Sequence, residues 1–314
     1  MPYLLTLLIY LNNMRVVDLF CGCGGLSLGF QNAGFTIVSA YDNWNLALDV
    51  YRLNFNHKAE ALNLSDVEHS VEVITADRPE MIIGGPPCQD FSSAGKRDED
   101  NGRGDLTTAY AEIVFHIRPE MFVMENVERI TKTRKLAEAI AIFRVAGYGL
   151  SQIVLDASKC GVPQKRKRFI MVGRLGEQDG FMDRYLNSGL SKKSMTIADY
   201  LGDALGLEYY YRHPRSYARR GIFSINEPSP TVRGVNRPMP STYKLRHNDP
   251  VQSKDGIRAL TTIERSYIQT FPRTFKFLGG KTDMEQLIGN AVPVNLGCHV
   301  ARAIRQYRDD NGLE

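Results

Sequence analysis

Cys88 lies in a sequence that could hold a thiol for chemistry. It ends the run Gly-Gly-Pro-Pro-Cys, which directly follows the apolar residues 81–83. This order predicts a buried strand that ends in a stiff, sharp turn, because glycines permit close backbone approach and prolines fix φ. A thiol held at the end of a strand can act as a nucleophile. The alternative is that Cys88 is a small buried hydrophobic residue, as free cysteines often are.

A glycine-rich turn follows the first predicted strand. From Asp18 to Gly25 the sequence is Asp-Leu-Phe-Cys-Gly-Cys-Gly-Gly, and it leads into a predicted helix. Such a turn lets a nucleotide-like ligand lie against the backbone, although tight turns of this kind are often purely structural. Asp42, at the end of the second predicted strand, can accept hydrogen bonds from both ribose hydroxyls. The turn lacks the Lys-Ser or Lys-Thr pair of a P-loop, so we do not expect a P-loop here. The turn and Asp42 together predict an adenosine-containing cofactor.

The remaining candidate site residues are Glu125 and two arginines in a basic run. Glu125 ends an apolar strand, so its carboxylate would point into the crevice where doubly wound sheets bind ligands. A helix cap or a surface salt bridge is the alternative role. Arg166 and Arg168 belong to a basic run that precedes another predicted strand. Since alternate residues of a strand share one side, both side chains would point toward the same phosphate or base oxygen.

Strands and helices alternate through the first half of the chain. We predict strands over residues 16–20, 36–41, 80–84, 121–125, 150–156 and 169–173, and helices over residues 26–33, 46–55, 106–118 and 135–146. This alternation predicts an α/β fold with a doubly wound, mainly parallel sheet. It ends near residue 175, and helical periodicity returns over residues 262–269, 284–288 and 296–307. We therefore predict a discontinuous α/β domain, residues 1–175 and 255–314, interrupted by a small domain over residues 176–254.

The composition of the 314 residues is that of an ordinary globular protein, with 43% apolar residues, 24% charged residues and a net charge of +4. Any nucleic-acid binding must come from local clustering, and residues 206–250 carry eight Arg or Lys against three Asp or Glu. Five cysteines without metal-site spacing predict free thiols in a reducing cytoplasm and no metal. The apolar residues 3–11 are too short to span a membrane, so residues 1–13 form either a packed element or an upstream extension before Met14.

Five motifs occur in an order that matches one family. They are Asp-Leu-Phe-x-Gly-x-Gly-Gly, Pro-Pro-Cys-Gln, Glu-Asn-Val, Gln-x-Arg-x-Arg and, from position 289, Gly-Asn-Ala-Val-Pro. With them the chain closely resembles the cytosine-5 DNA methyltransferases of bacterial restriction-modification systems, over residues 14–307. Five ordered motifs are far more specific than any one alone. The resemblance implies a Rossmann-like fold and a DNA (cytosine-5-)-methyltransferase activity.

The resemblance also implies S-adenosylmethionine as methyl donor and S-adenosylhomocysteine as product. Asp42 would hold the ribose and Asn43 would lie beside the adenine. The other residues expected to line the cofactor site are Phe20, Gly22, Cys23, Gly24, Asn63, Pro86, Leu106, Asn290 and Val292. Asn63 departs from the family, which usually has an aspartate that accepts from the adenine amino group. Its amide oxygen can still accept, so the departure concerns the affinity for the cofactor and not its identity.

The mechanism that the resemblance implies begins at Cys88. Its thiolate would add to carbon 6 of cytosine, so that carbon 5 becomes nucleophilic. Glu125 would bind nitrogen 3 and the amino group of the ring, sharing a proton as charge develops. Arg168, with Arg166 in support, would hold the base oxygen. The target base must first be flipped out of the duplex, and residues 89–105 would close over it as a lid.

The basic residues 206–250 would recognise double-stranded DNA. The Thr231-Val232 pair matches one that the family places beside the flipped nucleotide. The residues expected to contact DNA are Gln89, Arg97, Arg103, Arg212, Arg215, Arg219, Arg220, Thr231, Arg233 and Arg237. For any one arginine a phosphate is the more common partner, because phosphates receive over half of such bonds. We expect a monomer without a membrane partner, and a cognate restriction endonuclease would be a separate protein.

The sequence argues against three other functions. A transfer RNA cytosine-5 methyltransferase would share the chemistry, but the Cys-Phe-Thr signature of that branch is absent from this sequence. A catalytically inactive binding module would have lost Cys88, Glu125 or the glycine turn, and all are present. A nicotinamide-dependent dehydrogenase would have no use for the Pro-Pro-Cys-Gln motif.

Overall fold

The computed structural model describes residues 14–87, 106–214, 216 and 219–313. Several predictions concern residues outside these ranges. They are the predicted nucleophile Cys88, the predicted lid over residues 89–105 with Gln89, Arg97 and Arg103, the candidate DNA contact Arg215, and residues 1–13.

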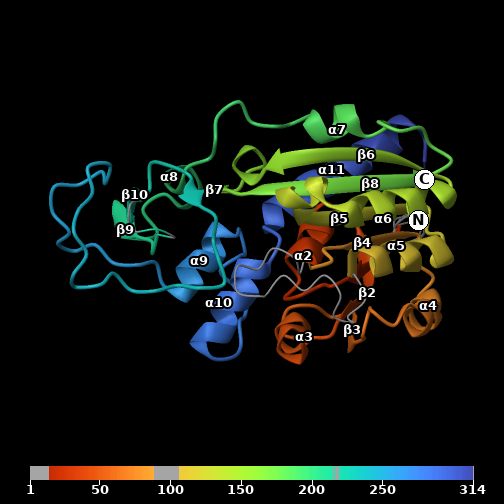
Figure 1. Cartoon of the computed structure of the whole chain (residues 1–314), viewed down its shortest axis with the longest axis horizontal. Coiled ribbons are helices and arrows are strands. Elements are labelled where there is room, and N and C mark those ends of the chain that lie inside the picture. Colours follow the sequence, from red (N-terminus) through yellow and green to blue (C-terminus); the bar gives the residue numbers. More distant parts are fainter. Residues whose placement is uncertain (1–13, 88–105, 215, 217–218, 314) are drawn as a thin grey trace, which may run out of the picture.

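A seven-stranded sheet forms the centre of the larger lobe (Figure 1). Its strands, in spatial order, are β3 (Lys58–Ala61), β2 (Thr36–Asp42), β1 (Arg15–Leu19), β4 (Met81–Gly84), β5 (Met121–Val127), β8 (Lys167–Leu175) and β6 (Tyr148–Asp156). The pairs from β3 to β5 are parallel, whereas β8 is antiparallel to both β5 and β6. The predicted mainly parallel, Rossmann-like sheet is confirmed, and β8 is the antiparallel strand within it.

Helices cover both faces of this sheet, as expected for a doubly wound fold. One face packs against α2 (Gly25–Asn32), α7 (Asp183–Asn187) and α11 (Val294–Asp310), and the other against α4 (Val67–Thr75), α5 (Leu106–Ile117) and α6 (Arg134–Val145). Ile82 and Ile83 of β4 belong to opposite cores, because successive side chains of a strand point to opposite faces. The helix α3 (Asn45–Arg52) packs on Ala40 and Phe55 near the β3 edge.

The predicted helices and strands of the first half are present with small shifts at their ends. Two elements were not predicted, β3 and α4. Short 3-10 helices, η2 (Glu128–Lys132) and η3 (Ala157–Lys159), follow β5 and β6. The predicted helices of the C-terminal part correspond to α9 (Thr262–Ile268), α10 (Lys281–Asn290) and α11.

The smaller lobe contains α8 (Ile197–Leu201), the antiparallel pair β9 (Tyr209–Tyr211) and β10 (Ile222–Ser224), and β11 (Ser229–Pro230). In Figure 1 it lies to the left of the sheet, with α9 and α10 between the two. Its core joins Ile197, Tyr210 and Phe223 to Ile268 of α9 and Ile288 of α10. One parallel ladder links it to the larger lobe, from Ser229 of β11 to Gln164 of β7 (Gln164–Lys165). The expected division of the chain into two domains at residues 176 and 254 stays a prediction. The helix α7, which lies within that range, packs on the large sheet.

Candidate active site

The glycine-rich turn between β1 and α2 forms one wall of a cavity. Phe20, Gly22 and Gly24 all have positive φ, at 58°, 53° and 93°. A Cβ at Gly24 would lie 2.4 Å from the Phe55 ring, and one at Gly25 would lie 2.2 Å from the Val292 carbonyl oxygen. A Cβ at Gly22, in contrast, would meet no atom within 4 Å. The turn therefore packs tightly against the protein at Gly24 and Gly25, while the backbone of Gly22 is open.

Asp42, at the end of β2, fixes the shape of this turn. Its Oδ2 accepts a hydrogen bond from the Gly22 amide at 2.8 Å, and its Oδ1 accepts one from the Trp44 amide at 2.9 Å. Burial raises the pKa of the Asp42 carboxyl group above its ordinary value, and the backbone donors oppose that shift. Each carboxylate oxygen has a further lone pair, so Asp42 can still accept from a ligand.

Asp18 was not among the predicted site residues. It is 1% exposed, its Oδ2 accepts from the Ser27 hydroxyl at 2.6 Å, and its Oδ1 has no hydrogen-bond partner among the described residues. Burial raises the pKa of this carboxyl group from 3.8 to about 7. The sequence held a usable signal, because a charged residue inside an apolar strand is rarely buried without a function.

The cavity has a volume of about 490 Å³ and lies at the ends of β1, β2, β4 and β5. That is the edge at which ligands bind in open α/β sheets. The predicted residues that line it are Phe20, Gly22, Cys23, Asp42, Asn43, Asn63, Pro86, Leu106, Glu125, Arg166, Arg168, Asn290 and Val292. Gly24 is not in its lining. The structure adds Asp18, Trp44, Leu62, Leu64, Pro87 and Asn126, which the sequence analysis did not select.

Asn63 projects from the loop after β3 and is exposed. Its amide oxygen already accepts hydrogen bonds from the Ser65 hydroxyl at 2.8 Å and from the Ser65 amide at 3.3 Å. This arrangement fixes which side-chain atom faces Ser65, so its amide NH₂ group is the part left for other partners.

Glu125 and Arg168 form an ion pair in the same cavity. The Arg168 Nε lies 2.8 Å from the Glu125 Oε1, and both side chains are almost buried, with exposed fractions of 13% and 11%. A second Arg168 donor, Nη1, reaches the Lys167 carbonyl oxygen at 2.7 Å. Burial lowers the pKa of Arg168, and the Glu125 charge opposes this shift. A carboxylate and a guanidinium group are therefore fixed next to each other beside the glycine turn.

The loop that leads to Cys88 is held by the residue after Glu125. The Asn126 side chain donates to the Pro86 carbonyl oxygen at 2.9 Å, and its own oxygen accepts from the Val127 amide at 2.8 Å. A Cβ at Gly85 would lie 3.1 Å from the Glu125 Oε2. Glycine at this position therefore leaves the second carboxylate oxygen uncovered on that side. Pro86 and Pro87 line the cavity, and Cys88 follows them in the sequence.

Arg166 lies between β7 and β8 and is 2% exposed. It lines the same cavity as Arg168, as the strand alternation predicted, but its terminal nitrogens bind backbone carbonyl oxygens. Nη1 donates to Val232 at 3.0 Å, and Nη2 donates to Gly289 at 3.0 Å and to Ala291 at 3.2 Å. These bonds occupy both terminal nitrogens, whereas the buried Nε has no hydrogen-bond partner among the described residues.

A second cleft lies between β7 and the smaller lobe. Its volume is about 550 Å³, and its charged lining residues are Lys165, Arg212, Arg219, Arg220 and Glu227. Thr231, which also lines it, donates from its hydroxyl to the Lys165 carbonyl oxygen at 2.8 Å. Four cations against one carboxylate make this cleft suitable for an anionic ligand.

The predicted DNA-contacting arginines differ in the contacts that their side chains make within the protein. Arg220 makes a bidentate pair with Glu227 and stacks on Phe223, with its Cζ 4.3 Å from the ring centroid. Arg212 donates to the Thr231 carbonyl oxygen, and Arg233 to that of His213. Arg219 and Arg237 are exposed, and neither side chain makes a hydrogen bond or ion pair with another described residue.

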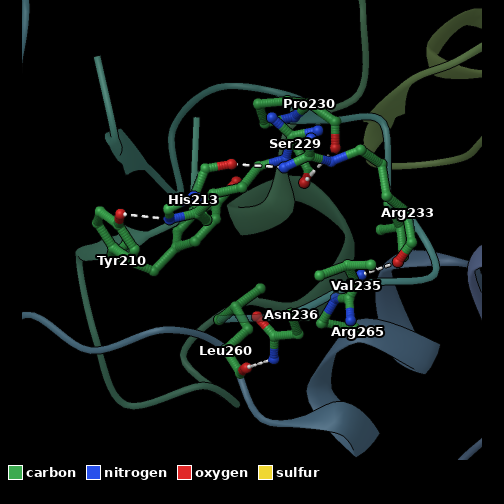
Figure 2. A pocket seen from close by; sticks show the side chains of 12 residues that line it. Tyr210, His213, Ser229, Pro230, Arg233, Val235, Asn236, Leu260 and Arg265 are labelled. Atoms are coloured by element: carbon green, nitrogen blue, oxygen red, sulfur yellow. Dashed lines mark hydrogen bonds between the residues drawn. The ribbon is translucent and has the colours of Figure 1, made fainter. Parts of the chain in front are cut away.

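A small pocket beside this cleft joins the smaller lobe to α9 (Figure 2). The Arg265 guanidinium group donates to the Arg233 carbonyl oxygen and pairs with Glu285, which also accepts from Thr262. The Asn236 amide donates to the Leu260 carbonyl oxygen at 2.8 Å. Burial lowers the pKa of Arg265 to about 10, with Arg212 and Arg233 as further causes. The side chains of Arg233, Arg265 and Asn236, which line this pocket, are therefore engaged in contacts within the protein.

Comparison with known proteins identifies the class to which this fold and cavity belong. The sequence model of the C-5 cytosine-specific DNA methylase family matches residues 14–306. The chain belongs to this family, and it is a DNA cytosine-5 methyltransferase.

Two type II methyltransferases are similar over nearly their whole length. The chain is 56% identical to M.HindV of Haemophilus influenzae over 95% of this chain and 98% of that protein. It is 52% identical to M.HgiDI of Herpetosiphon aurantiacus over 94% of this chain and 95% of that protein. These comparisons confirm the predicted family and activity, and they support DNA and not transfer RNA as the substrate.

Solved structures confirm the fold. The S. pombe Dnmt2 methyltransferase superposes with a TM-score of 0.70 at 18% identity, covering 96% of this chain and 99% of that one. A putative DNA modification methyltransferase encoded within an E. coli prophage gives a TM-score of 0.69 at 20% identity, covering 95% and 100%. At these identities the likeness concerns the fold alone.

The described residues of the chain contain neither a metal-binding cluster nor a membrane-spanning helix. No group of His, Cys, Asp or Glu among them has an arrangement that could hold a metal ion. No helix in that part of the chain is long and apolar enough to cross a membrane.

Proposed function

We propose that the cavity beside the glycine turn binds S-adenosylmethionine and releases S-adenosylhomocysteine. Three observations support the fit. The buried Asp18 Oδ1 lacks a partner in the described part of the chain and can accept from a polar or cationic group of a ligand. The open space around Gly22 lets a ligand approach the backbone. The volume of about 490 Å³ is in the range of small-molecule sites.

The residues of this chain would divide the binding of the cofactor among them. Asp42 would accept from the ribose hydroxyls, Asn43 would lie beside the adenine, and Asn63 would contribute its side-chain amide. Phe20, Gly22, Cys23, Pro86, Leu106, Asn290 and Val292 would form the remaining walls, and Gly24 would act through the shape of the turn. When bound, the cofactor supplies an electrophilic methyl group, and no metal is needed for that chemistry.

Cys88 would activate the cytosine ring. Its thiolate would add to carbon 6, forming a carbon–sulfur bond and making carbon 5 nucleophilic. After carbon 5 has taken the methyl group it must lose its proton. The electron pair of that bond would then expel the thiolate, restoring the double bond between carbons 5 and 6.

Glu125 and Arg168 would hold the base during these steps. The Arg168 Nε fixes one carboxylate oxygen of Glu125, and glycine at position 85 leaves the other open to nitrogen 3 and the amino group. Glu125 would share a proton with the ring as negative charge moves into it. Arg168 would bind the base oxygen through its remaining donors, and Arg166 would support the position of Arg168.

DNA would lie along the second cleft. Its four cations suit phosphate groups, and Thr231 would contact the flipped nucleotide. The exposed side chains of Arg219 and Arg237 would meet phosphates or guanines, and Arg212, Arg215, Arg220 and Arg233 would add further contacts. Gln89, Arg97 and Arg103 would add contacts from the proposed lid, closing over a base that must leave the stack before it can react.

The proposal extends to the setting in which the enzyme works. We expect a monomer in the cytoplasm, acting on double-stranded DNA and paired with a restriction endonuclease as a separate protein. Residues 176–254 would form the target-recognition domain. The type II names of the two similar relatives support this setting.

One observation carries the mechanism. The Glu125–Arg168 pair and the glycine turn line a single cavity, and so do the two prolines that precede Cys88. The decisive experiment uses duplex DNA in which every cytosine is replaced by 5-fluorocytosine, so that the target sequence need not be known. With S-adenosylmethionine, a covalent protein–DNA adduct should form and resist denaturing electrophoresis, because fluorine at carbon 5 blocks release of the thiolate.

The control for this experiment is a substitution at another cysteine. A Cys88→Ala variant should form no adduct, while Cys298→Ala, altered on α11 away from the cavity, should form it normally. An adduct that persists in Cys88→Ala would overturn the assignment of the nucleophile.

A further inference from the structure

Arg166 is held at a junction between two parts of the chain that are distant in sequence. Its three acceptors are the carbonyl oxygens of Val232 on one side and of Gly289 and Ala291 on the other. The planar guanidinium fork can bind several acceptors at fixed angles, which an ammonium group cannot do. The side chain is 2% exposed, so these bonds form away from water.

Two glutamines connect the same segments. The Gln164 side-chain oxygen accepts from the Val232 amide at 2.8 Å, and its NH₂ group donates to the Gln269 oxygen at 2.6 Å. Gln269 in turn donates to the carbonyl oxygens of Ile288 at 2.6 Å and Ala291 at 2.9 Å. Both glutamines are fully buried, so these bonds continue the junction that Arg166 forms.

The two segments also touch directly through their backbones. A Cβ at Gly289 would lie 2.2 Å from the Gly234 nitrogen and 2.4 Å from the Arg233 carbonyl carbon. Only glycine permits so close an approach. The backbone of residues 233–234 is therefore packed against Gly289, near the end of α10, with no side chain between them.

Each segment faces a different ligand. Asn290, Ala291 and Val292 line the proposed cofactor cavity. Thr231, directly before Val232, lines the basic cleft proposed for DNA. The junction is thus shared by the two binding sites.

Because Arg166 is a buried cation, we expect the two segments that it joins to move together. Its acceptors are neutral carbonyl groups, and Glu125, whose negative charge acts on Arg166, is already paired with Arg168. A buried cation that loses a hydrogen-bond acceptor is costly, at about 1–3 kcal/mol or more. If residues 231–234 shifted on binding DNA while residues 289–291 stayed in place, Arg166 would lose a carbonyl acceptor. A joint movement avoids this cost.

We propose that Arg166 is a positioning residue that couples DNA binding at residues 231–234 to cofactor binding at residues 289–292. This inference rests on the proposed function of the two sites. It assigns Arg166 a role through the backbone segments that it joins, in addition to its place behind Arg168. By linkage, the cofactor must change the affinity for DNA by the same factor as DNA changes the affinity for the cofactor.

The test measures binding and not turnover. S-adenosylhomocysteine is titrated calorimetrically into the protein alone and into the protein saturated with an unmethylated duplex, whose target site is first located by bisulfite sequencing. For the wild type, the dissociation constant should differ at least about fivefold between the two titrations, as is typical of coupled sites. For Arg166→Lys, which keeps the charge but not the three-way fork, the ratio should fall toward one.

A matched control separates coupling from simple loss of DNA affinity. Arg237→Ala should weaken DNA binding, but once saturated with DNA it should keep the wild-type ratio, because Arg237 does not contact the junction. A wild-type ratio in Arg166→Lys would overturn the proposal, and so would a ratio near one in the wild type. If either ligand failed to bind the wild type at all, the proposed function would fail instead.

A second variant acts on the backbone contact without touching any side chain of the junction. Gly289→Ala would push residues 233–234 and 289 apart, and it should also lower the ratio. If Arg166→Lys does not fold, this variant decides the question, since a wild-type ratio in Gly289→Ala would contradict a rigid junction.

Discussion

Arg168 contacts Glu125 diagonally across two antiparallel strands. Glu125 of β5 pairs in register with Ile170 of β8, and Arg168 lies two residues before Ile170 in β8. Residues two apart in a strand share a face, so the 2.8 Å contact between their side chains follows from the register. The antiparallel placement of β8 beside β5 thus fixes the carboxylate before any substrate arrives.

Replacing Glu125 by glutamine should remove its proton-sharing role and leave its shape. We expect kcat to fall by about 10²–10⁴, as is typical for the loss of a general acid–base group, with DNA binding retained. Transfer of a radiolabelled methyl group to DNA measures this. The control is Glu128→Gln, which alters an exposed carboxylate paired with Lys167 at 3.4 Å and should keep wild-type turnover. Near-normal activity of Glu125→Gln would remove Glu125 from catalysis.

Two neighbouring glycines should respond differently to alanine. In Gly25→Ala the new methyl group would lie 2.2 Å from the Val292 carbonyl oxygen, so α2 and the loop before α11 must separate and the melting temperature should fall by several degrees. In Gly22→Ala the methyl group meets no protein atom within 4 Å, and the left-handed φ costs only about 1–2 kcal/mol.

We therefore expect Gly22→Ala to weaken binding of S-adenosylhomocysteine more than it lowers thermal stability. Calorimetric titration and thermal unfolding of both variants provide the comparison. Equal cofactor affinity in Gly22→Ala and the wild type would show that the cofactor does not approach this part of the turn.

Asp18 should make stability depend on pH. Burial raises its pKa from 3.8 to about 7, so between these pH values the folded protein holds a proton that the unfolded chain has lost. The free energy of unfolding contributed by this group therefore falls as pH rises from about 4 to 7 and is constant above that. Asp18→Asn cannot ionise and should lack this loss.

The measurement is urea unfolding of the wild type and Asp18→Asn at several pH values. The stability of the variant relative to the wild type should rise by up to roughly 4 kcal/mol between pH 4 and 7. Parallel curves for the two proteins would show that Asp18 is ionised in the folded state throughout this range.

The arginines of the smaller lobe should fall into two classes. Arg219→Ala and Arg237→Ala should each weaken DNA binding and reduce the slope of log K against log salt by about one, as expected when one phosphate contact is lost. Arg220→Ala should instead lower the melting temperature, because it breaks the bidentate pair with Glu227 and the stacking on Phe223.

Binding isotherms at several salt concentrations, together with thermal unfolding, distinguish these classes. If Arg220→Ala reduced the salt slope without loss of stability, its pair with Glu227 would open on DNA binding, and Arg220 would join the first class.

The larger lobe was largely predictable because its strands are continuous apolar runs. Residues 81–84 and 121–124 are buried, and continuous apolar runs of this kind are typical of strands that are covered on both faces. The strand β3 was missed because it lies at the sheet edge and alternates charged and small residues, with one of its four residues buried. The helix α4 was missed because it buries only Ser70 and Ile74.

The insertion of β8 between β5 and β6 is a non-local pairing that no local pattern contains. The register that brings Arg168 to Glu125 depends on it, so the sequence could name both residues but not their contact. Strand alternation predicted correctly that Arg166 and Arg168 face one cavity. It could not foresee that carbonyl groups of residues 232, 289 and 291 would surround Arg166, because these positions lie far along the chain.

The close contact between Gly25 and Val292 has a consequence for biosynthesis. The glycine turn leaves the ribosome early, whereas Val292 and the helix α11, which packs on α2, are made much later. Until then the nascent chain lacks one wall of the cofactor cavity, and the apolar face of α2 has no helix to cover it. Folding of this lobe therefore cannot be completed until α11 has been synthesised, and the uncovered apolar face of α2 makes the nascent chain prone to aggregation before then.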